Sequence, residues 1–513
     1  MKSRSRRDHF LFLAASLAIC LILTPSCAAI QDSAKLYDFD AFVTRTMAEY
    51  DVPGAVIGIV ENDTVVYLKG FGVREYGKPA PVDPDTRFQV ASVTKYITAG
   101  AIGTLVDEGK LDWDTPVVTY LPGFVLKDTY AGQHATLRDL LAHRSGLKAY
   151  DGGLLGRVGY SNLEMLEQMR YLEPGSSFRE CSQYSNAGFF IAGEVAAAVD
   201  NRSWEDLTDA RILRPLNMTR SGTQFETLYF DENHIAGHIG SDGGVSIMPL
   251  EVDAFPAAGQ VVSTGRDMTQ WMRMILAGGL VDGRQILKPE TIKQIHAASM
   301  PLGSNGPLSD PNGANGMGCD SYNFLGERVI EKNGALNGVR SIVTLIPGKK
   351  SGIVVIANKN LVVFPEAVRT EFLERYIGKS EVDLQAKVKA QQAMWDMLGQ
   401  TSPTPSNPGP AKLDPSMIAG VYQSDLYGEL QVNPGPDAGN MTIQMGLNRF
   451  PGTITHWTDD TWYLSWPNPD DMAGFVTFTP GLSGSVTGIT SDEFGPFVRT
   501  IPGLPDLSKL PFF

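Results

Sequence analysis

The sequence predicts a mixed α/β (α+β) protein in which an antiparallel sheet flanked by helices precedes a C-terminal all-β barrel-like domain. Residues 55–60 and 65–73 have the composition of two strands joined at Asn62-Asp63, and apolar residues recur at helical spacing in residues 88–108. Eight short strand-like runs separated by turn residues follow in the last quarter of the chain. With 513 residues and 43% hydrophobic content, the protein can bury more than one core.

Residues 1–28 have the pattern of a secretory signal peptide. A basic start is followed by an apolar run from Phe10 to Leu23 and by small residues, which predicts cleavage after Ala28 or Ala29. We therefore expect a periplasmic or secreted protein; an uncleaved anchor and a lipoprotein modified at Cys27 are the alternatives. No later stretch has the roughly 20 apolar residues of a spanning helix, so we expect no stable membrane span after signal cleavage.

The charge and the cysteine content exclude several functions. A formal net charge of −14 argues against a nucleic-acid partner. Only Cys181 and Cys319 lie outside the signal, and the sequence leaves open whether they pair. The close pair His234 and His238 lacks the intervening glutamate of zinc peptidases, so we predict neither a metal site nor a bound cofactor.

The first domain is predicted over residues 35–378. After the hairpin come the helix ending at Gly109, a helix from Thr136, and a strongly apolar helix near residue 190. A small-residue turn then leads into an amphipathic helix within residues 257–279, which we interpret as scaffold. Three β-rich runs separated by glycine-rich turns follow in residues 328–360 and predict adjacent strands.

Ser92 and Lys95 are the first candidate catalytic residues. They lie one turn apart at the start of the predicted helix, on one face and at its positive dipole end. Burial disfavours the ammonium form of a lysine, so Lys95 could accept the proton of the Ser92 hydroxyl. A helix-capping serine beside a solvated lysine would give the same pattern.

Tyr184-Ser185-Asn186 precede the strongly apolar helix and form the second motif. A tyrosine hydroxyl has a pKa near ~10 and needs a close cation, such as Lys95, to act as a base at neutral pH. The Asn186 amide can hold a lysine or a substrate carbonyl. The alternative is a capping segment before a buried helix.

Lys332-Asn333-Gly334 form the third motif, within the β-rich runs. On a strand beside the nucleophile, Lys332 would supply positive charge for a substrate carboxylate, and Gly334 would let substrate approach the backbone. The alternative is a surface lysine in a turn.

The three motifs occur in the order Ser-x-x-Lys, Tyr-x-Asn, Lys-x-Gly, with the surrounding runs LLAHRSGL, YSNAGFFIAGEV and AAGQVVSTGRDMTQWM. Together they resemble the serine β-lactamase and penicillin-binding-protein superfamily, specifically its class C β-lactamase-like branch. The resemblance covers about residues 38–378. The branch includes D-Ala-D-Ala carboxypeptidases, D-amino-acid peptidases and amidases, and carboxylesterases.

The resemblance implies a role for each motif residue. Ser92 would be the acylated nucleophile, with Lys95 and Tyr184 as the proton-transfer pair. Substrate binding would involve Asn186, Lys332, Gly334 and Ala335, with the backbone N–H groups of Ser92 and Ala335 as the oxyanion hole.

One departure from the family pattern concerns the third motif. Asn333 stands where lactamases and carboxypeptidases usually carry threonine or serine, which weakens a β-lactamase interpretation. Lys332 stands where many non-lactamase relatives have histidine, which keeps carboxylate-bearing substrates in view. The chain has no Gly-x-Ser-x-Gly elbow, so an α/β-hydrolase lacks its nucleophile.

The C-terminal part is predicted as a helix and proline-rich linker over residues 379–412 and a β domain over residues 413–513. The β domain resembles the lipocalin-like domains attached to some relatives. We expect its aromatic residues to fill the barrel interior, with a surface facing the active site as the alternative; they include His456, Trp457, Trp462 and Trp466.

We therefore expect an exported serine hydrolase that cleaves amide bonds of small peptides or peptide-like compounds through an acyl-enzyme on Ser92. The alternatives are a carboxylesterase with the same residues, then a β-lactamase, then a non-catalytic sensor of cell-wall fragments. The oligomeric state is left open, a homo-oligomer included.

Overall fold

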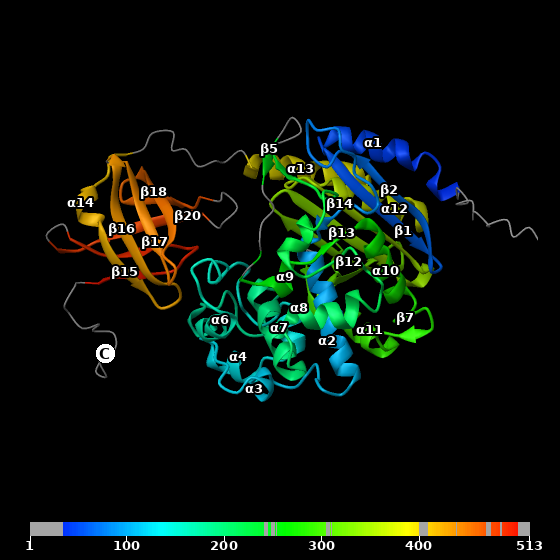
Figure 1. Cartoon of the computed structure of the whole chain (residues 1–513), viewed down its shortest axis with the longest axis horizontal. Coiled ribbons are helices and arrows are strands. Elements are labelled where there is room, and N and C mark those ends of the chain that lie inside the picture. Colours follow the sequence, from blue (N-terminus) through cyan, green and yellow to red (C-terminus); the bar gives the residue numbers. More distant parts are fainter. Residues whose placement is uncertain are drawn as a thin grey trace, which may run out of the picture.

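The structure is a computed structural model of the chain (Figure 1). It describes residues 34–500 except 241–244, 248–251, 253, 304–307, 309, 400–408, 438, 468–472 and 483–484. The expected signal peptide and part of the expected linker lie outside the described residues. Among the described helices, none is both long enough and apolar enough to cross a membrane.

An eight-stranded antiparallel sheet forms the centre of the first domain, in the order β2-β1-β14-β13-β12-β11-β10-β9. The turn between β1 and β2 is formed by Asn62 and Asp63, whose φ angles are 49° and 64°. Two consecutive positive φ angles are typical of the tight turns that match strand twist, so the predicted hairpin is confirmed. The strands are β1 (Gly54–Glu61), β2 (Thr64–Gly72), β9 (Met300–Pro301), β10 (Ala314–Asn315), β11 (Asp320–Phe324), β12 (Glu327–Leu336), β13 (Val339–Ile346) and β14 (Ser351–Ala357).

Alternate residues of the central strands face two different cores. In β1, Ile57 and Ile59 pack in one core with helices α1 (Phe39–Glu49) and α12 (Phe364–Tyr376), whereas Val56 and Val60 belong to the other core. This period of two is what a sheet covered on both faces requires. Helix α13 (Leu384–Gly399) lies on the α12 side, and α10 (Gly265–Leu276) covers the opposite face (Figure 1).

Helix α2 (Thr94–Asp107) runs through the middle of a helical region on the α10 side of the sheet (Figure 1). All but its last residues are buried, so it is a core helix rather than an amphipathic surface helix. The other helices of the domain are α3 (Val117–Tyr120), α4 (Thr129–His134), α5 (Leu137–Leu141), α6 (Asn162–Gln168), α7 (Asn186–Asp200), α8 (Trp204–Thr208), α9 (Pro256–Gly259) and α11 (Pro289–His296). Short strand pairs join β3 (Phe88–Gln89) to β6 (Val262–Ser263), β4 (Gly237–Ile239) to β5 (Val245–Ile247), and β7 (Leu280–Val281) to β8 (Arg284–Gln285).

The C-terminal strands close into an antiparallel barrel of eight strands, preceded by the short helix α14 (Pro415–Ile418). They are β15 (Gly420–Ser424), β16 (Gly428–Asp437), β17 (Asn440–Met445), β18 (Phe450–Thr458), β19 (Thr461–Ser465), β20 (Gly474–Pro480), β21 (Val486–Thr490) and β22 (Phe497–Thr500). Every strand-like run expected from the sequence is a strand here. The expectation of a helix-flanked antiparallel sheet and a C-terminal all-β barrel is therefore confirmed.

Side chains fill the inside of the barrel. Large residues such as Tyr422, Trp462 and Phe478 are buried, and their rings pack edge to face. An eight-stranded barrel is just wide enough for such packing. Trp466 is also buried, whereas His456 and Trp457 are only half-buried, so the expected filling holds for two of the four residues.

The barrel contacts the first domain at residues 150–160, a stretch we call the 150–160 segment. The N–H groups of Leu447 and Asn448 donate to the Val158 carbonyl, and Asn448 Nδ2 donates to the Arg157 carbonyl at 2.6 Å. Gly446 has a φ of +73°, and a Cβ there would lie 2.4 Å from the Cβ of Val158. A cavity of about 630 Å³ lies between the two domains; its lining includes Lys148, Leu172, Asp425, Leu426, Phe494 and Arg499.

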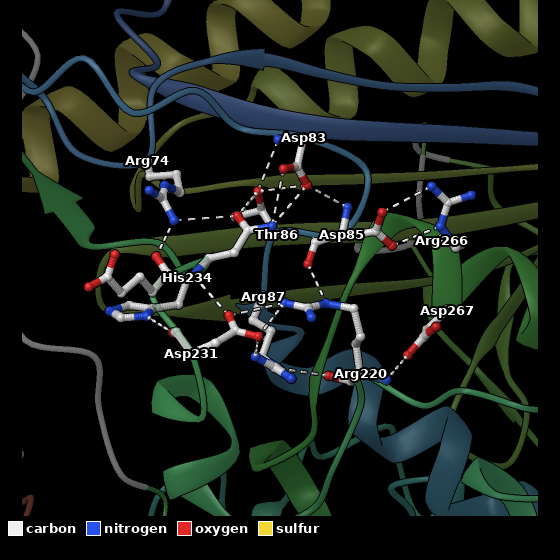
Figure 2. A network of polar contacts seen from close by, with 12 residues as sticks. Arg74, Asp83, Asp85, Thr86, Arg87, Arg220, Asp231, His234, Arg266 and Asp267 are labelled. Carbon is white, nitrogen blue, oxygen red and sulfur yellow. Dashed lines mark hydrogen bonds and ion pairs between the residues drawn. The ribbon is translucent and has the colours of Figure 1, made fainter.

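A polar network fixes the chain just ahead of β3 (Figure 2). Asp231 accepts ion pairs from Arg87 at 2.7 Å and from Arg220 at 2.9 Å. Arg266 on α10 forms a two-bond pair with Asp85. Because this network joins residues 83–87 to two other parts of the domain, it holds the start of the segment that carries Ser92.

We expect Asp231→Asn to lower the free energy of unfolding by about 1 kcal/mol at pH 7. The Asp231 side chain is 41% exposed, so solvent screens the pair. Burial acts to raise the pKa of Asp231, but hydrogen bonds from Arg87, the Asn233 backbone and Arg220 lower it to about 2. Because this pKa lies below the ordinary 3.8, the stabilisation is present above pH 4 and disappears as the pH falls toward 2.

Denaturant unfolding of the natural protein and the variant across this pH range measures the difference. Asp492→Asn is the matched control, because it removes the same charge from an exposed barrel residue outside the network. A difference that stays constant down to pH 2 would contradict the assignment.

Candidate active site

Ser92 lies in a tight turn directly before α2. The turn is a 3₁₀ helix over Ala91–Val93, so the α-helix expected to open at Ser92 begins at Thr94. The reason is the backbone of Ala91, whose φ of +51° is left-handed and costly for a residue with a Cβ. Val90 anchors the turn on both sides: its N–H donates to the Val261 carbonyl, and its own carbonyl accepts from Ser341 Oγ.

Lys95 is fully buried in the first turn of α2. Its Nζ donates to Asn186 Oδ1 at 2.7 Å and to the Ala258 carbonyl at 2.8 Å, and lies 3.3 Å from Ser92 Oγ. Burial, and then the positive charge of Lys332, lower the pKa of Lys95 well below its ordinary value. An unprotonated amine has two N–H groups for the two short bonds and a lone pair left for the Ser92 hydroxyl.

Tyr184 completes the immediate surroundings of Ser92 Oγ. A hydrogen bond of 2.8 Å joins its Oη to Ser92 Oγ. Burial raises the pKa of Tyr184, although the bond to Ser92 acts to lower it. Lys95 Nζ and Lys332 Nζ lie 4.8 and 5.4 Å from the centre of the Tyr184 ring, and neither offsets the effect of burial. Tyr184 is therefore a neutral phenol at neutral pH, and Lys95 is the better proton acceptor.

Asn186 is the first residue of α7 and presents its side-chain oxygen to Lys95. Its N–H donates to the Ala149 carbonyl at 3.2 Å. The neighbouring Ser185 caps α7, because its Oγ accepts from the Gly188 N–H. The capping alternative is thus correct for Ser185, and Asn186 still contacts Lys95 as the site interpretation requires.

The third motif lies on β12, next to the nucleophile. Lys332 is only 4% exposed, so the alternative of a surface lysine in a turn is wrong. Pairing of β12 with β11 ends at Glu331, and the following residues through Ala335 continue past the end of that neighbour. Asn333 and Ala335 are exposed.

Gly334 explains how β12 and the nucleophile come together. A Cβ at this position would lie 2.4 Å from Ser341 Oγ and 2.9 Å from the Ser92 backbone nitrogen. From the sequence, we expected Gly334 to let substrate approach the backbone. In the structure, the group that lies against Gly334 is the turn that carries Ser92. Gly334 therefore lets the Ser92 backbone nitrogen lie beside the backbone of β12. The Ala335 N–H on the same strand is the expected second donor of the oxyanion hole.

The sequence did not identify Ala258 as part of the site. Its carbonyl holds Lys95, and it belongs to α9, within the stretch interpreted as scaffold. Ala258 contributes a backbone carbonyl, and no pattern of side chains in the sequence predicts such a contact.

The histidine and cysteine residues of the described part form no metal cluster. His238 accepts from the Tyr76 N–H and bonds the Asn358 carbonyl. Cys181 is exposed and Cys319 is buried, and both are free thiols.

Comparison with known proteins agrees with this geometry. The Beta-lactamase family matches residues 39–375. A curated relative, the unguisins hydrolase ungD' of Aspergillus campestris, is 25% identical over 333 residues, which are 63% of this chain and 61% of the relative; the chain thus spans less than two thirds of that protein.

Two solved structures share the fold. The octameric penicillin-binding protein homologue from Pyrococcus abyssi has a TM-score of 0.58 and 22% identity, covering 90% of this chain and 99% of that one. A D-stereospecific amidohydrolase from Streptomyces sp. has a TM-score of 0.54 and 21% identity, covering 66% of this chain and 99% of that one. The protein therefore belongs to the Beta-lactamase family, and its resemblance to the serine β-lactamase and penicillin-binding-protein superfamily is confirmed.

Proposed function

We propose that this protein is an exported serine hydrolase that cleaves amide bonds of small peptides or peptide-like compounds through an acyl-enzyme on Ser92. The observation that carries the proposal is that Ser92 Oγ contacts both a buried amine, Lys95, and a neutral phenol, Tyr184. Export rests on the N-terminal sequence pattern alone.

In the acylation step, Lys95 Nζ takes the proton of Ser92 as Oγ attacks the substrate carbonyl carbon. The negative charge that develops on the carbonyl oxygen is stabilised by the backbone N–H groups of Ser92 and Ala335. Such donors act without reorganisation because the turn and β12 are fixed before substrate arrives.

When the tetrahedral intermediate collapses, Tyr184 donates its hydroxyl proton to the leaving nitrogen and the C–N bond breaks. The proton held by Lys95 then restores the phenol. Water next attacks the acyl ester, Lys95 accepts its proton, and Ser92 is released with its own proton restored. The balance is one amide and one water converted to one acid and one amine.

The neutral phenol favours amides over esters. An amine leaves only after protonation, whereas an alkoxide or phenolate of low basicity can leave unassisted, so a proton donor beside Oγ matters most for amide substrates. A carboxylesterase is the second candidate, because the same acyl-enzyme chemistry serves esters. A β-lactamase is the third candidate, because Asn333 stands where lactamases usually carry threonine or serine.

Lys332 supports a substrate that carries a carboxylate. Its buried amine lies beside Tyr184 and forms no direct ion pair within the described ranges, although its charge acts to lower the pKa of the buried Asp320, which burial raises. A bound carboxylate would supply that partner. The fungal relative is named a hydrolase, which agrees with the class of reaction.

A panel of substrates tests the proposal. Purified mature protein and Ser92→Ala are compared on L- and D-configured peptide amides, a short-chain nitrophenyl ester and a chromogenic cephalosporin. We expect hydrolysis of peptide amides to exceed the other activities and to fall by a factor on the order of 10³ or more in Ser92→Ala.

Two outcomes would redirect the assignment. Cleavage of the ester alone would make the protein an esterase. Activity that survives Ser92→Ala, in a variant whose circular dichroism is unchanged, would mean that another group is the nucleophile.

The pH dependence of the rate tests Lys95 as the proton acceptor. The charge of Lys332 contributes to the lowered pKa of Lys95, so Lys332→Met should raise that pKa. Because the reaction needs the unprotonated amine, the acid limb of kcat/KM should move to higher pH, by about 0.5 to 1 unit. A neutral nitrophenyl ester is the substrate, since its binding does not use Lys332.

Lys332→Arg is the matched control for this experiment, because it retains the charge and should leave the limb in place. An unchanged limb in Lys332→Met would contradict Lys95 as the titrating base.

The barrel contact tests whether the second domain shapes the substrate range. Gly446→Ala would place a methyl group against Val158 and shift the 150–160 segment, which begins next to the Ala149 carbonyl that holds Asn186. We expect the ratio of kcat/KM for a peptide amide to that for the small ester to change by a factor of about 3 to 10. Gly495→Ala is the control: its φ of +70° imposes similar backbone strain, but its Cβ would meet nothing within 4 Å. An equal change in both variants would rule out a role for the contact.

A further inference from the structure

His143 lies beside Tyr184 but has no step in the proposed mechanism. It follows α5, has a left-handed φ of +57°, and is only 2% exposed. We infer that His143 is a positioning residue that holds the Tyr184 hydroxyl against Ser92. The inference rests on the proposed function for its kinetic consequences, but its geometry stands on the contacts alone.

His143 binds the backbone on both sides of Tyr184. Its carbonyl accepts from the Gln183 N–H at 2.7 Å, and its ring atom Nδ1 accepts from the Ser185 N–H at 3.1 Å. One residue thus bonds to the backbone N–H groups of the residues that flank Tyr184. Because the backbone is held on both sides, the position from which the Tyr184 side chain extends toward Ser92 is fixed.

The imidazole ring also supports the phenol ring directly. The ring centres of His143 and Tyr184 lie 4.6 Å apart at a tilt of 34°, and Phe189 contacts the imidazole at 5.4 Å. This packing closes the space into which the Tyr184 ring would otherwise swing. The hydroxyl is therefore left pointing to Ser92 Oγ, at the 2.8 Å described above.

The role requires a neutral imidazole, because Nδ1 can accept from Ser185 only when it carries no proton. Burial, followed by the charge of Lys332, lowers the pKa of His143 well below its ordinary value. The remaining proton then sits on Nε2, which is buried and has no hydrogen-bond partner among the described residues. A side chain that only filled space would avoid this unsatisfied group, so the Nδ1 contact is the feature that demands histidine.

Two substitutions separate the Nδ1 contact from simple space filling. Glycine and asparagine both tolerate the left-handed backbone, so neither introduces strain. His143→Gly removes the acceptor and the ring. His143→Asn keeps an acceptor close to the position of Nδ1 but loses the ring.

We expect His143→Gly to lower kcat on the best Ser92-dependent substrate by a factor of about 10 to 10², with KM changed less than about threefold. His143→Asn should recover part of the rate, because it restores the acceptor for the Ser185 N–H but not the ring packing. In a Tyr184→Phe background, His143→Gly should cost less than about twofold more, because a residue that acts through Tyr184 has no further effect once the hydroxyl is gone. Additive losses, or a natural rate in His143→Gly, would overturn the inference.

Crystal structures of the natural protein and the two variants supply a test that needs no substrate. The distance from Tyr184 Oη to Ser92 Oγ should exceed 3.5 Å in His143→Gly and stay within hydrogen-bond range in His143→Asn. If the panel shows no Ser92-dependent turnover, the proposed function fails, yet this distance still decides the positioning role. An unmoved Tyr184 hydroxyl in His143→Gly would overturn it.

Discussion

The burial of Lys95 is the constraint on which the rest of the site depends. An amine removed from water needs partners for its two N–H groups and its lone pair, and Ser92, in the turn before α2, faces the lone pair. The acceptors of the two N–H groups come from α7 and α9, at positions 91 and 163 residues beyond Lys95. The fold must therefore bring two distant segments to one atom, and the same burial that makes these contacts necessary keeps the amine free to accept a proton.

The contact between the Ser92 turn and β12 is a second constraint of the same kind. It requires a left-handed Ala91 on one side and a residue without a side chain, Gly334, on the other. Strain of this kind persists only where the surroundings determine the backbone, and here Ser341 and Val261 supply the bonds that hold it. The result of this strain is that the Ser92 backbone nitrogen lies against β12 at Gly334.

Local patterns explain how much could be predicted from the sequence. The hairpin at Asn62-Asp63 and the barrel strands followed from periodicity, because each depends on residues close together in the chain. The grouping of Ser92, Lys95, Tyr184 and Asn186 followed from the order of the motifs and the family that they resemble. The start of α2 was placed two residues early, since the conformation of Ala91 depends on contacts with Gly334, Ser341 and Val261 rather than on its chain neighbours.

Other parts of the site could not be predicted because they involve backbone groups or contacts between distant residues. The Ala258 carbonyl has no side-chain signature. The paired bonds of His143 to Gln183 and Ser185 span about 40 residues, and the sequence showed only a histidine at the end of a helix. The expected role of Gly334 differed from the observed one because the group that lies against it, the Ser92 turn, is far away in the sequence.

The packed interior of the barrel limits what that domain can do. With Tyr422, Trp462 and Phe478 filling the centre, the barrel acts through its outer turns, and the turn at Gly446 meets the 150–160 segment. That segment continues the stretch that begins at His143 and includes Ala149, so it is joined by backbone bonds to the Tyr184 and Asn186 side of the site. Ser92 and Lys95 are held instead by β12 and α9. A shift of the barrel therefore reaches Tyr184 and Asn186 before it reaches Ser92. Under the proposed mechanism, this is the arrangement expected of a domain that tunes substrate choice without making the chemistry.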